Sequence, residues 1–157
     1  MNQMPSTDRE ELAISHARPY TAPDVRVFYD RGRCLHFAEC VRGLPEVFDV
    51  GKRPWIQPEN ASAEQVAEVV RRCPSGALYY RLEEGPPEEP EQPTHVELVA
   101  NGPINMRGDL SIEVSAGRMR EVRASLCRCG RTQNEPFCDN ACRRAGWTSE
   151  APSRDND

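Results

Sequence analysis

The sequence lacks any long apolar segment. No part of its 157 residues approaches the ~20 consecutive apolar residues that span a bilayer, and its first residues lack the basic and then apolar pattern of a secretory signal. Aromatic residues make up only 6% of the chain and hydrophobic residues 38%, which is lean for one large core. These absences predict a soluble cytoplasmic protein built from small units, with no membrane association.

An excess of positive charge is also absent. The formal net charge is −5, and the segment 83–93 alone carries −5, whereas residues 21–82 carry +1 and residues 94–148 carry +2. Neither part has the strongly basic face typical of nucleic-acid-binding proteins, so we expect no nucleic acid partner.

Familiar catalytic motifs are missing as well. The sequence contains no glycine-rich nucleotide-binding fingerprint and no nucleophile accompanied by a base in a familiar arrangement. It therefore predicts a protein that is not an enzyme.

Residues 83–93 are mostly glutamate and proline, and they divide the chain. Proline stiffness and like-charge repulsion predict an extended, semi-rigid linker there. It separates a small α+β domain at 21–82 from a β-rich domain at 94–148, so the predicted fold class is α+β. The polar tails at 1–20 and 149–157 are expected to be mobile. Domains this small often depend on a metal or on disulfides for stability.

One helix is well marked in the first domain, at about 63–72. Ser62 and Gln65 have the spacing of a capping box at its start. Pro74 stops the helix, and the apolar stripe predicts that Cys73 emerges on its buried face.

Short strands are predicted from alternating or apolar runs bounded by turn residues. In the first domain these are 25–29 and 77–80, and in the second domain 96–100, 110–114 and 119–126.

Seven cysteines are available, an odd number that does not allow full pairing as disulfides. In a reducing compartment such thiols more often bind metal. Four of them follow the pattern C-x-C-x8-C-x3-C, at Cys127, Cys129, Cys138 and Cys142. Gly130 suits the turn that brings the second pair round to the first. The spacing alone is compatible with a tetrahedral zinc site or an iron–sulfur site, or with free thiols.

This segment resembles the CDGSH-type iron–sulfur domain. The matching positions are Cys127, Cys129, Thr132, Pro136, Cys138, Asp139, Asn140 and Ala141. The family has a histidine where this chain has Cys142. The resemblance implies a [2Fe–2S] cluster with Cys127 and Cys129 on one iron and Cys138 and Cys142 on the other. We expect Asp139 to cap a short helix that carries Cys142 in its first turn, and Thr132 to play a structural role.

The other three cysteines, Cys34, Cys40 and Cys73, lie in the first domain. Cys34 and Cys40 have the spacing of the outer cysteines of a ferredoxin loop, and Cys73-Pro74 matches the Cys-Pro that closes such a ligand set. Residues 20–82 thereby resemble the divergent mono-cluster ferredoxin family. The resemblance implies a [4Fe–4S] or [3Fe–4S] cluster, with His36 as a candidate fourth ligand. The alternative is that the three thiols pack in the core as small apolar groups.

The function predicted from these sites is electron transfer by a two-cluster iron–sulfur protein with a protein redox partner. Two other functions fit the same cysteines: iron–sulfur cluster storage, transfer or sensing, and a structural zinc module that binds a partner. Relatives of the second domain occur as dimers or in tandem, so the resemblance allows a monomer or a homodimer.

Overall fold

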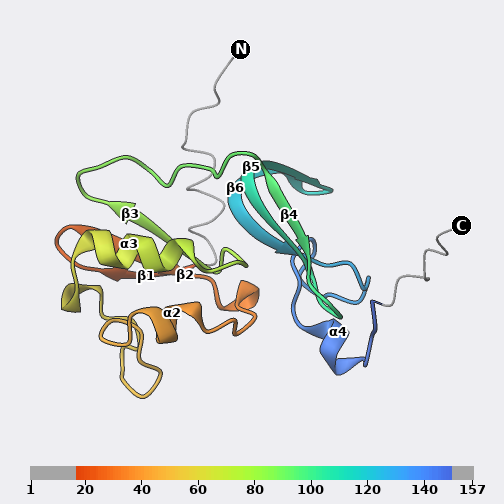
Figure 1. Ribbon diagram of the computed structural model, residues 1–157, viewed down its shortest axis with the longest axis horizontal. Coiled ribbons are helices and arrows are strands. Elements are labelled where there is room, and N and C mark those ends of the chain that lie inside the picture. The colour runs from red at the N-terminus through yellow and green to blue at the C-terminus, as the bar shows by residue number, and fades with distance from the viewer. Residues whose placement is uncertain (1–16, 150–157) are drawn as a thin grey trace, which may run out of the picture.

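The computed structural model describes residues 17–149, which form two antiparallel three-stranded sheets joined by a long connection (Figure 1). The first sheet has the order β1-β2-β3 and the second β4-β5-β6. The strands are β1 (Arg18–Thr21), β2 (Val25–Tyr29), β3 (Leu78–Leu82), β4 (His95–Leu98), β5 (Ile104–Val114) and β6 (Gly117–Leu126). With helices in the first half and mainly strands in the second, the fold confirms the predicted α+β class.

The first domain builds its core between its sheet and helix α3 (Ala63–Arg71). The predicted capping box is present, because the Ser62 side chain accepts from the Gln65 backbone N–H and the Gln65 side chain accepts from that of Ser62. Val66 and Val70 on the inner face are fully buried. Between β2 and α3 lie the 3-10 helices η1 (Arg31–Arg33) and η2 (Pro58–Asn60) and the short helix α2 (Glu39–Gly43).

Strand β1 begins before the predicted start of the domain. Arg18–Thr21 pairs with β2, and Tyr20 is buried opposite Val27. The assignment of residues 18–20 to a mobile tail is therefore wrong. Pro19 obscures the strand in the sequence, but proline is tolerated here because β1 lies at the edge of the sheet. Residues 1–16 and 150–157 lie outside the described residues.

The second domain is dominated by the hairpin of β5 and β6, which is longer than the sequence predicts. An irregularity between Arg107 and Leu110 shifts the register, so that Leu110 and Ala124 point into a small core with Phe137. Helix α4 (Ala141–Arg144) follows the cysteine-rich loop. Ser149, predicted to belong to a mobile tail, exchanges hydrogen bonds with Asn101.

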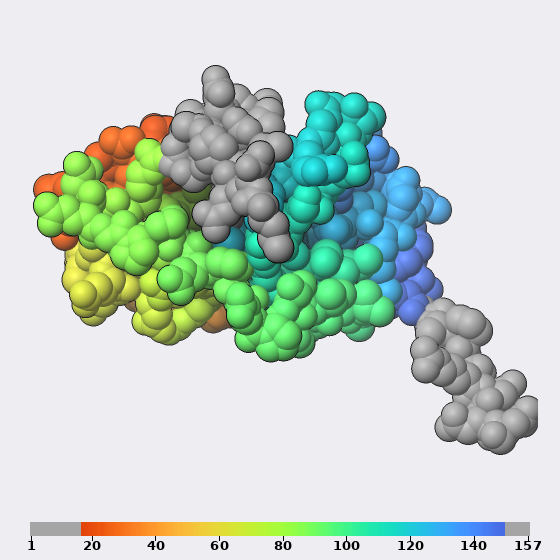
Figure 2. Space-filling view, turned by 90° about the horizontal axis from the view of Figure 1, so that it is seen from above, coloured from red at the N-terminus to blue at the C-terminus, as the bar shows by residue number. Residues whose placement is uncertain are grey.

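The acidic linker has no helix or strand, but it is not a free spacer. The Glu88 carboxylate is held at 2.8 and 2.9 Å by the Arg123 guanidinium, with both side chains at most 10% exposed. Arg123 also donates to the Leu78 carbonyl of the first domain at 2.9 Å, so the two domains lie in contact. The segment after β3 runs along their surface from one to the other (Figure 2). The prediction of an extended spacer missed this contact because Arg123 is 35 residues away.

Candidate metal centres

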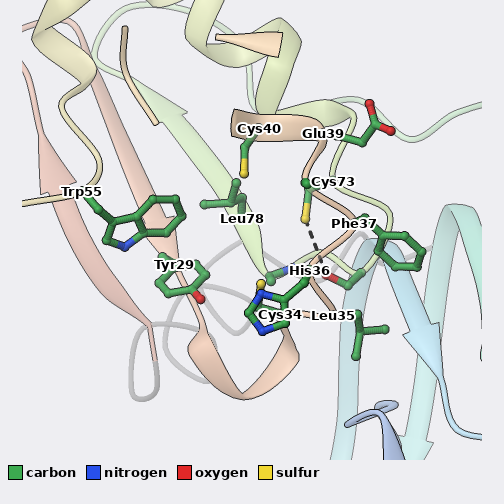
Figure 3. A pocket seen from close by; sticks show the side chains of 13 residues that line it. Tyr29, Cys34, Leu35, His36, Phe37, Glu39, Cys40, Trp55, Cys73 and Leu78 are labelled. Atoms are coloured by element: carbon green, nitrogen blue, oxygen red, sulfur yellow. Dashed lines mark hydrogen bonds between the residues drawn. The ribbon is translucent and has the colours of Figure 1, made fainter. Parts of the chain in front are cut away.

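The first site is a pocket between helices α2 and α3 and the first sheet. Cys34 follows η1, Cys40 lies in the first turn of α2, and Cys73 follows the end of α3. All three thiols line this pocket, together with the aromatic side chains of Tyr29 and Trp55 (Figure 3). The core-packing alternative is therefore incomplete: Cys40 and Cys73 do pack against the core, but all three cysteines also face a common pocket.

The loop that carries Cys34 and Cys40 is bent by two residues with left-handed backbone conformations. His36 has a φ of 59° and Ala38 a φ of 64°. Arg42 braces the loop by donating to the Phe37 carbonyl at 2.8 Å. His36 lines the pocket but is exposed, and its role as a fourth ligand stays a prediction.

The thiols of this site influence one another electrostatically. Burial and then the nearby Cys73 raise the pKa of Cys40 to about 11, with a smaller effect from Cys34. Burial and a hydrogen bond with Cys34 also raise the pKa of Tyr29. Three thiolates in this apolar pocket would repel one another, so a positively charged metal centre would relieve an unfavourable charge.

The second site is formed where the cysteine-rich loop folds back on the end of β6. Leu126 and Phe137 form an isolated antiparallel bridge. The Cys127 backbone N–H donates to the Pro136 carbonyl, and the Cys138 N–H donates to the Ser125 carbonyl, both at 2.9 Å. These bonds place Cys138 beside Cys127, as the sequence predicts for a loop that brings the second pair of cysteines round.

Two side chains of the predicted motif hold this loop in shape. The Thr132 hydroxyl donates to the Phe137 carbonyl at 2.7 Å, which supports a structural role. Asp139 accepts from the backbone N–H groups of Gln133 and Ala141 at 3.1 and 3.0 Å. Although burial opposes it, these bonds and the Arg144 guanidinium lower the pKa of Asp139.

The prediction for the start of α4 was partly wrong. Asn140, with a φ of 65°, occupies the N-cap, and Asp139 precedes it. Asp139 still satisfies the N–H of the first helical residue, Ala141. Cys142 lies in the first turn of α4, as expected. The left-handed conformation at Asn140 moves the start of the helix one residue further than the sequence suggests, and asparagine adopts it more readily than most residues.

The four thiols of the second site form two pairs. The sulfur atoms of Cys127 and Cys129 are 3.7 Å apart, close to the roughly 3.8 Å that separates two thiolates bound at about 2.3 Å to one tetrahedral metal. Cys138 and Cys142 are both buried and lie in one packed cluster with Leu35. Within residues 17–149, no three His, Cys, Asp or Glu side chains lie close enough around one point to hold a single metal ion.

Backbone donors stabilise negative charge on these sulfurs. The Asn140 N–H donates to the Cys138 sulfur at 3.4 Å. Against the effect of burial, the N–H groups of Thr132 and Gly130 lower the pKa of Cys127. Burial nevertheless raises the pKa of Cys138 to about 11. N–H donors aimed at cysteine sulfurs are a known means of stabilising anionic metal–thiolate centres.

Comparison with known proteins identifies both halves of the chain. The family model described as "Divergent 4Fe-4S mono-cluster" matches residues 20–83, and "Iron-binding zinc finger CDGSH type" matches residues 101–141. The uncharacterized protein YjdI of Escherichia coli, from strains K12 and O157:H7, is 39% identical over 64 residues, which cover 41% of this chain and 84% of the relative. The chain belongs to the divergent 4Fe-4S mono-cluster family. No solved structure gave a significant match.

The mono-cluster domain is here fused to a CDGSH-type domain, in the order that the sequence predicts. The alignment spans 84% of YjdI, so the rest of that protein is too short for a second domain of this kind. The CDGSH-type match ends at residue 141, immediately before Cys142. Both domains are iron–sulfur domains, and their thiols and N–H donors suit such centres.

One residue that the sequence analysis missed, Leu35, is placed between the two sites by the structure. Leu35 is 4% exposed and packs with Cys138 and Cys142 of the CDGSH-type domain, although its neighbour Cys34 lines the mono-cluster pocket. In Figure 3 it lies on the side of the pocket nearest the strands of the second domain. No sequence signal could have found this contact, because it joins loops about 100 residues apart. None of the helices within residues 17–149 has the length and apolarity needed to cross a bilayer.

Proposed function

We propose that this chain is an electron-transfer protein with two iron–sulfur clusters. A [2Fe–2S] cluster is assigned to Cys127, Cys129, Cys138 and Cys142. A [4Fe–4S] or [3Fe–4S] cluster is assigned to Cys34, Cys40 and Cys73, with His36 as the candidate fourth ligand of a [4Fe–4S] cluster.

The observation that carries the proposal is the pairing of the thiols in the second site. Cys127 and Cys129 have the 3.7 Å separation expected of two ligands on one metal. Cys138 and Cys142 form a second pair, buried together in one packed cluster. Two pairs supply two ligands to each iron of a [2Fe–2S] cluster, whereas one tetrahedral zinc ion needs all four sulfurs around a single point. This favours iron–sulfur binding over a structural zinc module.

Electron transfer is favoured by what surrounds the thiols. A cluster held at either site would supply one-electron redox chemistry. The chain contributes a largely apolar pocket at the first site and N–H donors to sulfur at the second. We therefore propose a protein redox partner, no substrate chemistry and a reducing compartment such as the cytoplasm.

A second function, cluster transfer to another protein, is favoured by the uneven burial of the second site. Cys138 and Cys142 are buried, at 4% and 3% exposure, whereas Cys127 and Cys129 are partly exposed. A partner thiol would therefore reach the 127/129 side first. A cluster that is delivered needs one such accessible side.

Anaerobic purification tests the proposal. Iron and acid-labile sulfide are measured per chain, and electron paramagnetic resonance spectra are recorded before and after reduction. Cys142→Ser should abolish the signal of the second site and Cys73→Ser that of the first, each leaving the other signal in place. Stoichiometric zinc without sulfide would refute the assignment.

Repeated redox cycling of the loaded protein distinguishes electron transfer from cluster transfer. An electron carrier keeps its iron through repeated reduction and reoxidation. A transfer protein passes iron and sulfide to an apo-ferredoxin, leaving the 127/129 thiols free to alkylate.

A further inference from the structure

Two arginines of the second domain reach across the domain boundary. Arg107 on β5 and Arg123 on β6 are direct cross-strand partners. Like charges directly opposite each other in a sheet are destabilising on their own. In this structure both guanidinium groups reach beyond the hairpin, to carbonyl oxygens of the first domain, and Arg123 also reaches Glu88 of the linker.

Arg107 binds the last carbonyls of helix α3. Its guanidinium donates to the carbonyl oxygens of Arg71 at 2.7 Å and Arg72 at 3.2 Å. These are the two residues that precede Cys73. A cation at the C-terminal end of a helix is favourable because the helix dipole is negative there and the last carbonyls lack helical partners.

Arg123 binds the turn that carries Cys73 itself. It donates to the carbonyl oxygens of Val70 at 2.9 Å, Cys73 at 2.6 Å and Leu78 at 2.9 Å. Its side chain is 3% exposed, and Glu88 of the linker balances its charge. Each of the three carbonyls lies in the first domain, so a buried residue of the second domain fixes the backbone around a cysteine of the first site.

The two domains also approach closely at Gly76, three residues after Cys73. A Cβ atom at Gly76 would lie 2.4 Å from the Arg123 carbonyl oxygen and 2.5 Å from the Arg33 guanidinium. Arg33 fixes the junction from the other side, since it donates to the same Arg123 carbonyl at 3.2 Å and to Glu121 at 2.9 Å.

We propose that Arg107 and Arg123 are positioning residues for the first metal centre, so that retention of iron by the mono-cluster domain depends on the CDGSH-type domain. The inference rests on iron–sulfur binding by both domains and not on electron transfer. The two arginines contact no cysteine sulfur. They act by holding the backbone of Cys73 in the position from which its thiol faces Cys40.

The test compares variants of the full-length protein, loaded anaerobically and challenged with an iron chelator. The two sites are followed separately by their electron paramagnetic resonance signals, assigned with Cys73→Ser and Cys142→Ser. We expect Arg123→Met to lose iron from the first site at least tenfold faster than wild type and to alter the line shape of that signal. Arg107→Met should give a smaller acceleration, about threefold, and the second site should keep its wild-type rate within about threefold.

The matched control is Arg120→Met. Arg120 lies on the same strand as Arg123 but is 52% exposed and pairs with Asp109 of its own domain. Arg120→Met should leave the rates of iron release from both sites unchanged. If Arg123 served only its own strand, its loss would release iron first from the second site, which β6 leads into. That result, or a first site as stable as in wild type, overturns the proposal.

If Arg123→Met fails to fold, the conservative variant Arg123→Lys tests the proposal instead. Arg123→Lys keeps the charge but loses the planar fork that reaches three carbonyls and a carboxylate. It should give an intermediate release rate at the first site with unchanged circular dichroism. A wild-type rate in this variant also overturns the proposal.

Discussion

The sharpest prediction concerns the linker carboxylate, Glu88. We expect Glu88→Gln to destabilise the apo protein strongly, because the substitution preserves shape but leaves the buried Arg123 guanidinium without its counter-ion. The bidentate pair has N–O distances of 2.8 and 2.9 Å, and its side chains are 3% and 10% exposed.

The size of the expected loss of stability follows from this burial. Removing one partner of a buried ion pair costs about 3–5 kcal/mol, whereas an exposed pair contributes less than about 1 kcal/mol. Arg123 keeps three carbonyl acceptors, and the glutamine oxygen can replace one bond, so the lower end of the range applies. The expected loss is about 3 kcal/mol in the free energy of unfolding, which is roughly a 150-fold change in the folding equilibrium.

Glu89→Gln is the matched control. It makes the same chemical change at the next residue of the linker, whose side chain is exposed. Urea unfolding of both metal-free variants, followed by circular dichroism, gives the two free energies at equal net charge. The difference should persist at 1 M salt, because buried pairs are screened little. Equal stabilities within about 0.5 kcal/mol would refute the argument that the linker is anchored.

Four further outcomes are expected. Cys142→His should raise the midpoint potential of the second site in a redox titration, because neutral imidazole favours the reduced state more than thiolate does; a potential below wild type would contradict this. Leu35→Ala should lower the free energy of unfolding in urea by about 2–4 kcal/mol, since Leu35 is 4% exposed. Leu98→Ala, at a position 62% exposed, should lower it by less than about 0.5 kcal/mol. Equal losses would contradict the buried contact of Leu35. In the apo protein, mass spectrometry at pH 8 should find Cys127 alkylated before Cys138. Although burial opposes it, backbone N–H donors lower the pKa of Cys127. Burial raises the pKa of Cys138 from 9.0 to about 11. Between pH 9 and pH 11 the folded state therefore binds more protons than the unfolded state. The contribution of Cys138 to stability is present below pH 9 and is lost as the pH rises towards 11. A free energy of unfolding that does not fall over this pH range would contradict the raised pKa.

The local features of this fold could be predicted from the sequence because their signals are local. The capping box of Ser62 and Gln65 starts α3 where expected. The turn that returns Cys138 to Cys127 depends on residues inside the cysteine-rich segment itself. Both depend on contacts between residues close in sequence, which spacing and residue type describe well.

The junction between the domains could not be predicted in this way. Arg33 and Arg123 are 90 residues apart, and each looks like an ordinary surface arginine in the sequence. Their burial depends on carbonyl groups, which every residue has and no pattern marks. For the same reason the linker was predicted to be an extended, semi-rigid spacer, since nothing near Glu88 indicates that its carboxylate binds the Arg123 guanidinium.

The contact at Gly76 limits how this pair of domains can vary. The backbone there has a φ of 71°, and no atom of the size of a methyl carbon fits between it and the facing strand. An alanine there would meet the Arg123 carbonyl oxygen of one domain and the Arg33 guanidinium of the other, in a backbone conformation that residues with a Cβ rarely adopt. The absence of a side chain at Gly76 is therefore what lets the turn after Cys73 lie directly against β6.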